Sequence, residues 1–297
     1  RIQNVIEEIT TNWVSDLKKK NTFFGEKVKL ALAGGVFANV LLNQKLAALP
    51  NVEEIFVFPA MGDGGLCAGA AFATNAKHQK NNRPKALQHV YLGPILQHER
   101  TKEILEKSGL VFTQPEDIFK ATAKLLSENK IVGRFDGRME YGPRALGNRS
   151  ILCSAESKTA NEKLNQKFPR SVFMPFAPAV MSEHADEFFH IQNERRATSF
   201  MTVTCDVKSK TKKLFPAIVH VDGTARPQLV SKSDDSNFYF ILKSYKEITG
   251  YPILVNTSFN IHEEPIVMSA EDAIESFLRA KLDALSIGQF LILNPTT

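Results

Sequence analysis

The sequence predicts an α/β (α+β) protein built from two successive units. Within the first 76 residues, two apolar strands are each followed by a glycine-rich turn and a helical pattern. This order is typical of an α/β layer that binds its ligands at the carboxyl ends of the strands. Residues 77–90 are polar and helix-breaking, and so predict a linker. A second series of helical and strand patterns then begins at residue 91.

The first unit opens with apolar residues at helical spacing over 2–20, which predict an amphipathic helix that needs a partner. The other predicted elements of this unit are strands over 28–33 and 55–58 and helices over 36–49 and 66–76.

The second unit alternates helical periodicity with short apolar runs bounded by turn residues, as expected for helices packed on a sheet. Its predicted elements are helices over 99–107, 115–128 and 269–282, and strands over 131–135, 200–205, 253–260, 283–287 and 290–293.

Composition narrows the class of protein. With 43% hydrophobic and 23% charged residues, the chain has the composition of a globular protein. It contains no apolar run near the ~20 residues that a membrane span needs, and no signal peptide. These two observations predict a cytoplasmic location. Cys67, Cys153 and Cys205 lie far apart and indicate neither a disulfide framework nor a zinc site. The net charge of +5 can steer anionic substrates, whereas nucleic acid is the less favoured partner because the lysine runs lack interleaved aromatic residues.

The most informative stretch is 137–152, which holds three glycines and three arginines directly after a predicted strand. Guanidinium groups suit bidentate contact with phosphate or carboxylate, and glycine lets the backbone approach a ligand, so an anion site is the first hypothesis. Pro143 could open a short helical turn with free N–H groups beside the anion. The alternative is a surface turn whose arginines pair with Glu140 and other acids. The three arginines are Arg138, Arg144 and Arg149.

Residues 137–152 read GRMEYGPRALGNRSIL and resemble the motif GRMEFGPRALGNRSIL of the NodU/CmcH/TobZ carbamoyltransferases. In that family a YrdC-like domain makes carbamoyl adenylate from carbamoyl phosphate and ATP, and a neighbouring actin-like ATPase domain passes the carbamoyl group to a hydroxyl. The resemblance implies that 1–90 are the C-terminal part of the actin-like domain plus linker. It implies that 91–297 are a YrdC-like α/β domain with a mixed twisted sheet.

The glycine-rich turns of the first unit are similar to the GGVxxN and GDxG segments of the family, which implies nucleotide contacts for them. The residues that match are Gly34, Gly35, Asn39, Gly62 and Gly64.

Asp63 lies in the second of these segments, where the family has an iron ligand; alternatively, it caps the following helix. The family's HxxxH pair, which supplies the other ligands, is absent, because no two of the seven histidines are four apart. We therefore expect a C-terminal portion or truncated member, with Fe²⁺ only in the full-length protein.

Three segments of the second unit carry further matches. Arg170 precedes a Phe-Met-Pro-Phe-Ala-Pro run like that of the family, which implies a phosphate contact. His220, Asp222 and Arg226 belong to an HxDGTARxQ pattern that implies ligand contacts, with a structural His–Asp pair as the alternative. A predicted strand ends in an NTSFN run that resembles the SxN element of YrdC-like nucleotide sites, although such residues also form Asx turns. The matching residues of this run are Asn256, Ser258 and Asn260.

The resemblance thus implies an enzyme that forms carbamoyl adenylate from carbamoyl phosphate and ATP with Mg²⁺, for transfer to a small-molecule hydroxyl. Catalysis would rest on positioning and fixed positive charge, because two anions must be brought together. Two alternatives stay open: a threonylcarbamoyl enzyme of tRNA modification, and a non-catalytic nucleotide-binding fragment. A homodimer is also left open. The catalytic residues are expected to be Arg138, Arg144, Arg149, Arg170 and Arg226.

Overall fold

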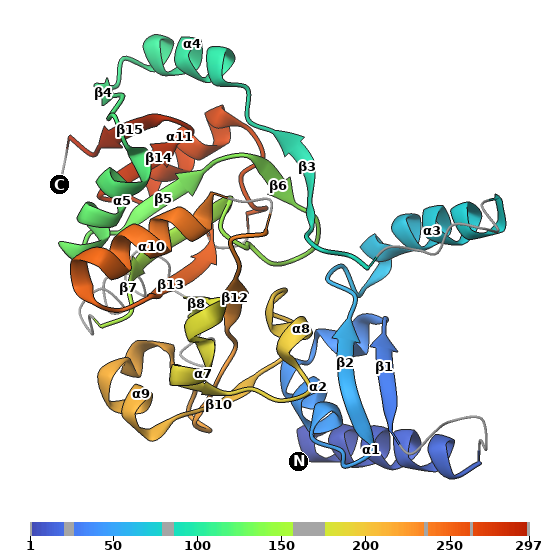
Figure 1. Ribbon diagram of the computed structural model, residues 1–297. Coiled ribbons are helices and arrows are strands. Elements are labelled where there is room, and N and C mark those ends of the chain that lie inside the picture. Colours follow the sequence, from blue (N-terminus) through green and yellow to red (C-terminus); the bar gives the residue numbers. More distant parts are fainter. Residues whose placement is uncertain are drawn as a thin grey trace.

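The computed structural model describes residues 2–20, 27–78, 86–156, 176–234, 237–261 and 264–295. A large α/β body holds most of the chain, and the N-terminal residues form a smaller layer of two strands and helices beside it (Figure 1). The predicted α/β class is confirmed. Arg170 lies outside the described residues.

The large body is centred on an eight-stranded sheet with the order β12-β8-β13-β7-β5-β14-β15-β4. β12 and β8 are parallel, as are β14 and β5, while the other neighbours are antiparallel. The sheet is therefore mixed, as the resemblance implied. Its strands are β4 (Phe112–Thr113), β5 (Val132–Phe135), β7 (Arg149–Ser154), β8 (Ala177–Met181), β12 (Gln228–Val230), β13 (Ile253–Ser258), β14 (Ala284–Ile287) and β15 (Phe290–Leu293).

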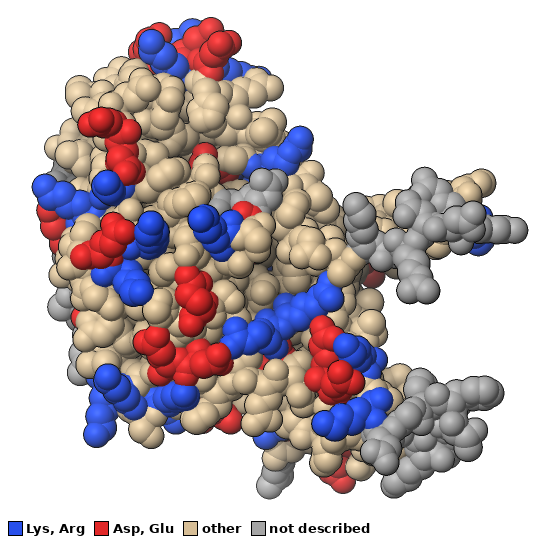
Figure 2. All heavy atoms as spheres, viewed as in Figure 1, with Lys and Arg blue, Asp and Glu red and all other residues tan. Residues whose placement is uncertain are grey.

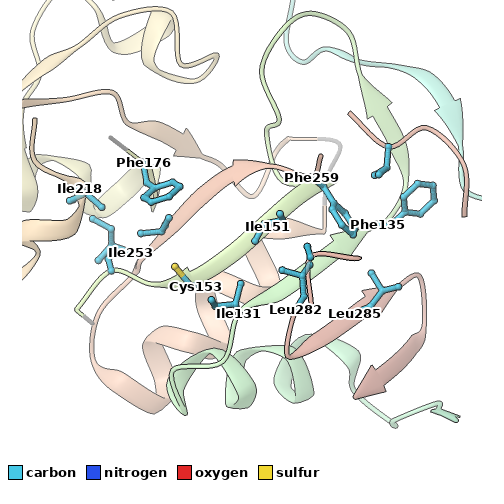
Figure 3. Close-up of a cluster of buried hydrophobic side chains, with 14 of the residues drawn as sticks. Ile131, Phe135, Ile151, Cys153, Phe176, Ile218, Ile253, Phe259, Leu282 and Leu285 are labelled. Atoms are coloured by element: carbon cyan, nitrogen blue, oxygen red, sulfur yellow. The ribbon is translucent and has the colours of Figure 1, made fainter. Parts of the chain in front are cut away.

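The two faces of this sheet bury different clusters of apolar side chains, because successive residues of a strand point to opposite faces. Ile151 and Cys153 of β7 join the cluster drawn in Figure 3, whereas Leu152 joins the cluster under α5 and α10. Phe119 and Phe240 stack between those two helices with ring centroids 5.6 Å apart. The helices of the two faces are α4 (His98–Ser108), α5 (Ile118–Ser127), α10 (Phe238–Thr249) and α11 (Ala270–Arg279).

Local signals set the ends of these helices. α5 begins at Asp117, whose carboxylate accepts hydrogen bonds from two backbone N–H groups. α11 begins with a capping box between Ser269 and Asp272, and α10 ends at Gly250 in the left-handed conformation that glycine tolerates. The predicted helices over 115–128 and 269–282 are therefore confirmed, with α5 starting three residues later than expected.

The N-terminal layer consists of a parallel strand pair packed against α1 and α2. Its core includes Phe37, Leu42 and Ile55, together with Ala197 and Val203 from the larger body, so the two parts of the chain share one apolar cluster. The outer face of α1 and the whole of α3 expose apolar side chains within the described residues. Its elements are α1 (Ile2–Lys20), β1 (Val28–Leu32), η1 (Gly35–Ala38), α2 (Val40–Ala47), β2 (Val52–Val57), η2 (Asp63–Gly65) and α3 (Leu66–His78).

Two smaller sheets complete the fold: β3 pairs with β6, and β11, β10 and β9 form an antiparallel group. The elements not yet introduced are β3 (Tyr91–Ile95), β6 (Arg138–Glu140), η3 (Ser182–His184), α7 (Ala185–Phe188), β9 (Phe189–His190), α8 (Arg195–Thr198), β10 (Cys205–Val207), α9 (Ser209–Leu214), η4 (Pro216–Ile218) and β11 (Thr224–Ala225).

Three local predictions are wrong. The predicted strand over 200–205 is a buried turn that reverses at Met201, where φ is 54°, and only Cys205 begins a strand. Pro143 does not open a helical turn, since residues 141–147 form irregular bends. The helix predicted over 36–49 is divided into the short 3₁₀ turn η1 and α2, because Asn39 caps α2.

The described surface carries charges of both signs. On the face shown in Figure 2, lysines and arginines alternate with acids, so the described atoms of this face form no broad patch of a single sign. None of the helices described is both long and apolar enough to cross a membrane.

Candidate functional site

A cavity of about 310 Å³ lies where the arginine-rich loop, the ends of β8 and β13, and the start of α2 meet. Both parts of the chain line it, since Val40 and Leu41 come from the N-terminal layer. A concave site with a few convergent polar groups is the usual form of a small-molecule site. Six of the residues singled out in the sequence line this cavity: Arg144, His220, Asp222, Arg226, Asn256 and Ser258.

Arg144 brings an uncompensated positive charge to the cavity. Burial lowers the pKa of its guanidinium, its Nε is fully buried without a hydrogen-bond partner, and no carboxylate of the described chain pairs with it. A buried cation without a partner is unfavourable, so an anion in the cavity would be stabilised strongly by this group.

The loop that carries Arg144 is shaped by Glu140, which the sequence predicted only as a partner for the arginines. Its Oε1 instead accepts hydrogen bonds from the backbone N–H groups of Leu146 (2.7 Å), Asn148 (2.8 Å) and Arg149 (3.3 Å). Charge-assisted bonds of this kind are stronger than neutral ones. Glu140 therefore fixes the backbone from which Arg144 projects.

His220 and Asp222 lie in a turn rather than on a strand, and Thr224 joins them. Asp222 Oδ1 accepts hydrogen bonds from the Thr224 hydroxyl (2.7 Å) and backbone N–H (3.0 Å), and the same hydroxyl lies 3.1 Å from His220 Nδ1. Burial lowers the pKa of His220, and the Arg226 cation lowers it further against the opposing effect of Asp222. For Asp222, burial acts to raise the pKa, but the bonds from Thr224 outweigh it and the pKa lies below its ordinary value. Asp222 is thus ionised and His220 neutral at neutral pH.

The end of β13 supplies the polar wall of the cavity. Asn256 is fully buried, and its Nδ2 donates to Gln228 Oε1 (2.8 Å) and to the Ala145 carbonyl (3.3 Å). Ser258 follows on the same strand, two residues on and thus on the same face. Asn260 does not line the cavity, because its Nδ2 donates to the Glu264 carbonyl (2.8 Å) and holds the following loop.

Two of the arginines expected to be catalytic, Arg149 and Arg138, do not line this cavity. Arg149 is fully buried beneath the loop, where Nη1 donates to the Asp136 carbonyl (2.7 Å) and the guanidinium lies 3.7 Å from the centroid of the Phe135 ring. Burial lowers its pKa to about 10, so it remains a cation with a structural role. Arg138 is exposed and donates to the Gly93 carbonyl (3.2 Å).

The predicted nucleotide contacts of the N-terminal layer also lie outside the cavity. Gly34 and Gly35 form the turn after β1, where the Gly34 N–H donates to the Met61 carbonyl (2.6 Å) and joins the two glycine-rich turns. Asn39 caps α2 by accepting from the Leu42 N–H (3.1 Å), so its side chain has a structural partner.

The second glycine-rich turn contacts the arginine-rich loop. The carbonyl of Gly64 accepts a hydrogen bond from the Tyr141 hydroxyl, and Gly142 approaches Pro59 so closely that a Cβ on this glycine would lie 3.2 Å from the proline carbonyl oxygen. Gly62 precedes η2 in the same turn. This turn therefore supports the loop that carries the cavity arginine.

Asp63 is exposed and is the first residue of η2, the turn that leads into α3. No group of three or more His, Cys, Asp or Glu side chains that could hold a metal occurs among the described residues. A single carboxylate does not hold a transition metal, so the residues present around Asp63 do not fit the iron site of the family.

Comparison with known proteins supports the family resemblance of the motif at residues 137–152. Residues 123–294 match the family described as "Carbamoyltransferase C-terminus". The chain belongs to the carbamoyltransferase family. Residues 1–72 match the family described as "Carbamoyltransferase N-terminus", so the family resemblance drawn from residues 137–152 is confirmed for both parts.

The chain has several curated relatives. It is 37% identical to an uncharacterized protein of Methanocaldococcus jannaschii over 98% of this chain and 55% of the relative. It is 38% identical to nodulation protein NolNO of Sinorhizobium fredii over 90% of this chain and 40% of that protein. The chain thus spans about half the length of these relatives. Among solved structures it resembles a full-length HypF in its phosphate- and nucleotide-bound form, with a TM-score of 0.43 and 23% identity over 63% of this chain and 22% of HypF.

Proposed function

We propose that this chain is the part of a carbamoyltransferase that binds carbamoyl phosphate and ATP and forms carbamoyl adenylate, the donor for a hydroxyl of a small molecule. The observation that carries the proposal is the guanidinium of Arg144, which faces the cavity without an acidic partner in the described chain. Arg226 lines the same cavity and adds a second cation. Two cations match two reactants that both carry phosphoryl oxygens.

The chemistry asks for charge more than for a protein nucleophile. Water releases phosphate from carbamoyl phosphate and leaves carbamate, whose oxygen then attacks the α-phosphorus of ATP as the bond to pyrophosphate breaks. Each step moves negative charge onto phosphoryl oxygens, which prepositioned guanidinium groups stabilise. Mg²⁺ would enter bound to ATP, since Asp222 is the one acidic side chain among the described residues of the cavity wall.

The boundaries of the cavity favour a site shared by two domains. The proposed division places residues 1–90 in the actin-like domain with its linker and 91–297 in the YrdC-like domain, and α2 of the first lies against the cavity of the second. Transfer to the acceptor would then occur near this junction.

Pyrophosphate release from ATP, with carbamoyl phosphate and Mg²⁺ present, tests the proposal. We expect release by the intact chain, and a loss of about 100-fold in rate for Arg144→Ala, the scale found when one transition-state donor is removed. Arg138→Ala is the matched control, because this arginine of the same motif lies outside the cavity. ATP binding without pyrophosphate release would instead support a non-catalytic nucleotide-binding role.

A further inference from the structure

Tyr141 anchors the arginine-rich loop on the N-terminal layer. Its hydroxyl donates a hydrogen bond to the carbonyl of Gly64 in η2, and the edge of its ring meets the Phe58 ring, with centroids 6.5 Å apart. Its backbone N–H donates to the carbonyl of Val90 (2.7 Å) at the end of the linker. Tyr141 stands three positions before Arg144, so these contacts lie close to the arginine that faces the cavity.

The hydroxyl of Tyr141 belongs to this chain and not to the motif that residues 137–152 resemble, which has phenylalanine at this position. A phenylalanine would keep the contact with Phe58, and the close approach of Gly142 to Pro59 involves no atom of the residue 141 side chain. The junction can therefore form without the hydroxyl. The hydroxyl adds one directional bond to a contact that packing already makes.

We propose that Tyr141 is a positioning residue that couples the cavity to the second glycine-rich turn through its hydrogen bond to Gly64, which we call the tether. The inference rests on the proposed function and adds a connection between the anion site and the N-terminal layer. Residues 143–145 line the cavity, so an anion that fixes Arg144 also restricts the loop that begins at Tyr141. The coupling is reciprocal: the tether strengthens anion binding by the same factor by which the anion favours the closed tether.

Cys67 provides a reporter of the tether. Its Sγ lies 3.4 Å from the Tyr141 hydroxyl and 3.4 Å from the Gly64 carbonyl, so a closed tether crowds the thiol. Cys67 is exposed, whereas Cys153 and Cys205 are buried, and burial raises the pKa of both these thiols and keeps them unreactive. Cys67 lies outside the described wall of the cavity, so a bound anion does not cover its thiol directly.

The test measures the alkylation rate of Cys67 by iodoacetamide, a neutral reagent that does not compete for an anion site. The ligand is phosphonoacetamide, in which a methylene replaces the bridging oxygen of carbamoyl phosphate and prevents hydrolysis. We expect saturating phosphonoacetamide to slow alkylation of the intact chain by about two- to threefold, the lower end of the range for one hydrogen bond, because the Gly64 carbonyl belongs to an exposed residue.

Calorimetry on the same preparation shows whether phosphonoacetamide binds. Binding without a change in the alkylation rate would overturn the inference and leave the proposed anion site standing. Absence of binding would overturn the proposed function and the inference with it.

Two phenylalanine variants separate coupling from a purely structural role. In Tyr141→Phe we expect phosphonoacetamide to bind about two- to threefold more weakly, and the alkylation rate of Cys67 to become independent of the phosphonate. Tyr91→Phe is the matched control, because the Tyr91 hydroxyl donates to the Leu146 carbonyl (3.0 Å) of the same loop. It should lower stability and keep the dependence on the phosphonate. A dependence that persists in Tyr141→Phe, or that disappears in both variants alike, would contradict the coupling.

Discussion

Arg144 and Arg149 stand five positions apart in one motif, yet the fold gives them opposite surroundings. Arg149 begins β7 and is fully buried, with its guanidinium bonded to backbone carbonyls and stacked on Phe135. Arg144 lies in the irregular loop before it, faces the cavity and has no acidic partner in the described chain. One arginine therefore serves the fold, and the other is available to an anion.

The difference shows that hydrogen-bond partners, more than burial, distinguish an arginine that supports the fold from one that is available to bind an anion. Both guanidinium groups have a pKa lowered by burial. Nη1 of Arg149 donates to the carbonyls of Asp136 and Asn148, although its Nε, like that of Arg144, has no partner in the described chain. No such carbonyl bonds are found for Arg144 among the described residues. The contrast leads to opposite expectations for substitutions at the two positions.

The largest effect is expected for Arg149→Ala. It removes the stacking on Phe135 and leaves several buried carbonyls without a donor, so the free energy of unfolding should fall by about 3 kcal/mol or more. Urea denaturation measures the change. Arg138→Ala provides the exposed control and should stay within about 0.5 kcal/mol of the native protein. A stable Arg149→Ala protein that no longer binds phosphonoacetamide, a stable phosphonate analogue of carbamoyl phosphate, would place Arg149 in the site after all.

Arg144→Leu should behave in the opposite way. Because it removes a buried charge that lacks a partner, the free energy of unfolding should stay constant or rise by about 1 kcal/mol, while the affinity for phosphonoacetamide falls by about 100-fold. Denaturation and calorimetry on the same preparation separate the two effects. Loss of stability together with unchanged affinity would reverse the assignment of the two arginines.

Glu140→Gln sharpens the comparison, because Glu140 holds the segment between the two arginines. The neutral amide oxygen accepts weaker hydrogen bonds from the Leu146 and Asn148 N–H groups, which should lower the free energy of unfolding by about 1–2 kcal/mol. Looser positioning of Arg144 should reduce the affinity for phosphonoacetamide by about tenfold. Native affinity in a destabilised Glu140→Gln protein would show that the loop does not need this carboxylate to present Arg144.

The sequence predicted elements such as α11 and β13 because their apolar periodicity matches the faces they bury, but it did not predict α10 or the strands β7, β8 and β12 of the main sheet. It failed over 200–205, where alternating apolar residues are typical of a strand. There Phe200 packs on Phe56, Val203 joins the core of the N-terminal layer and Cys205 joins the core of the large body. The alternation of apolar and polar residues in this segment reflects three separate tertiary contacts. The local sequence pattern alone cannot distinguish this arrangement from a β-strand.

The motifs singled out Arg144 and Asn256, which both line the cavity. They did not distinguish Arg144 from Arg149, because the hydrogen-bond partners of each guanidinium are set only when the chain folds. Glu140 binds backbone N–H groups of the folded loop, and no sequence pattern predicts this role. The role of Thr224 could have been predicted from the sequence. A hydroxyl two residues after an aspartate favours a local side-chain hydrogen bond, and the Asp222–Thr224 contact has this form.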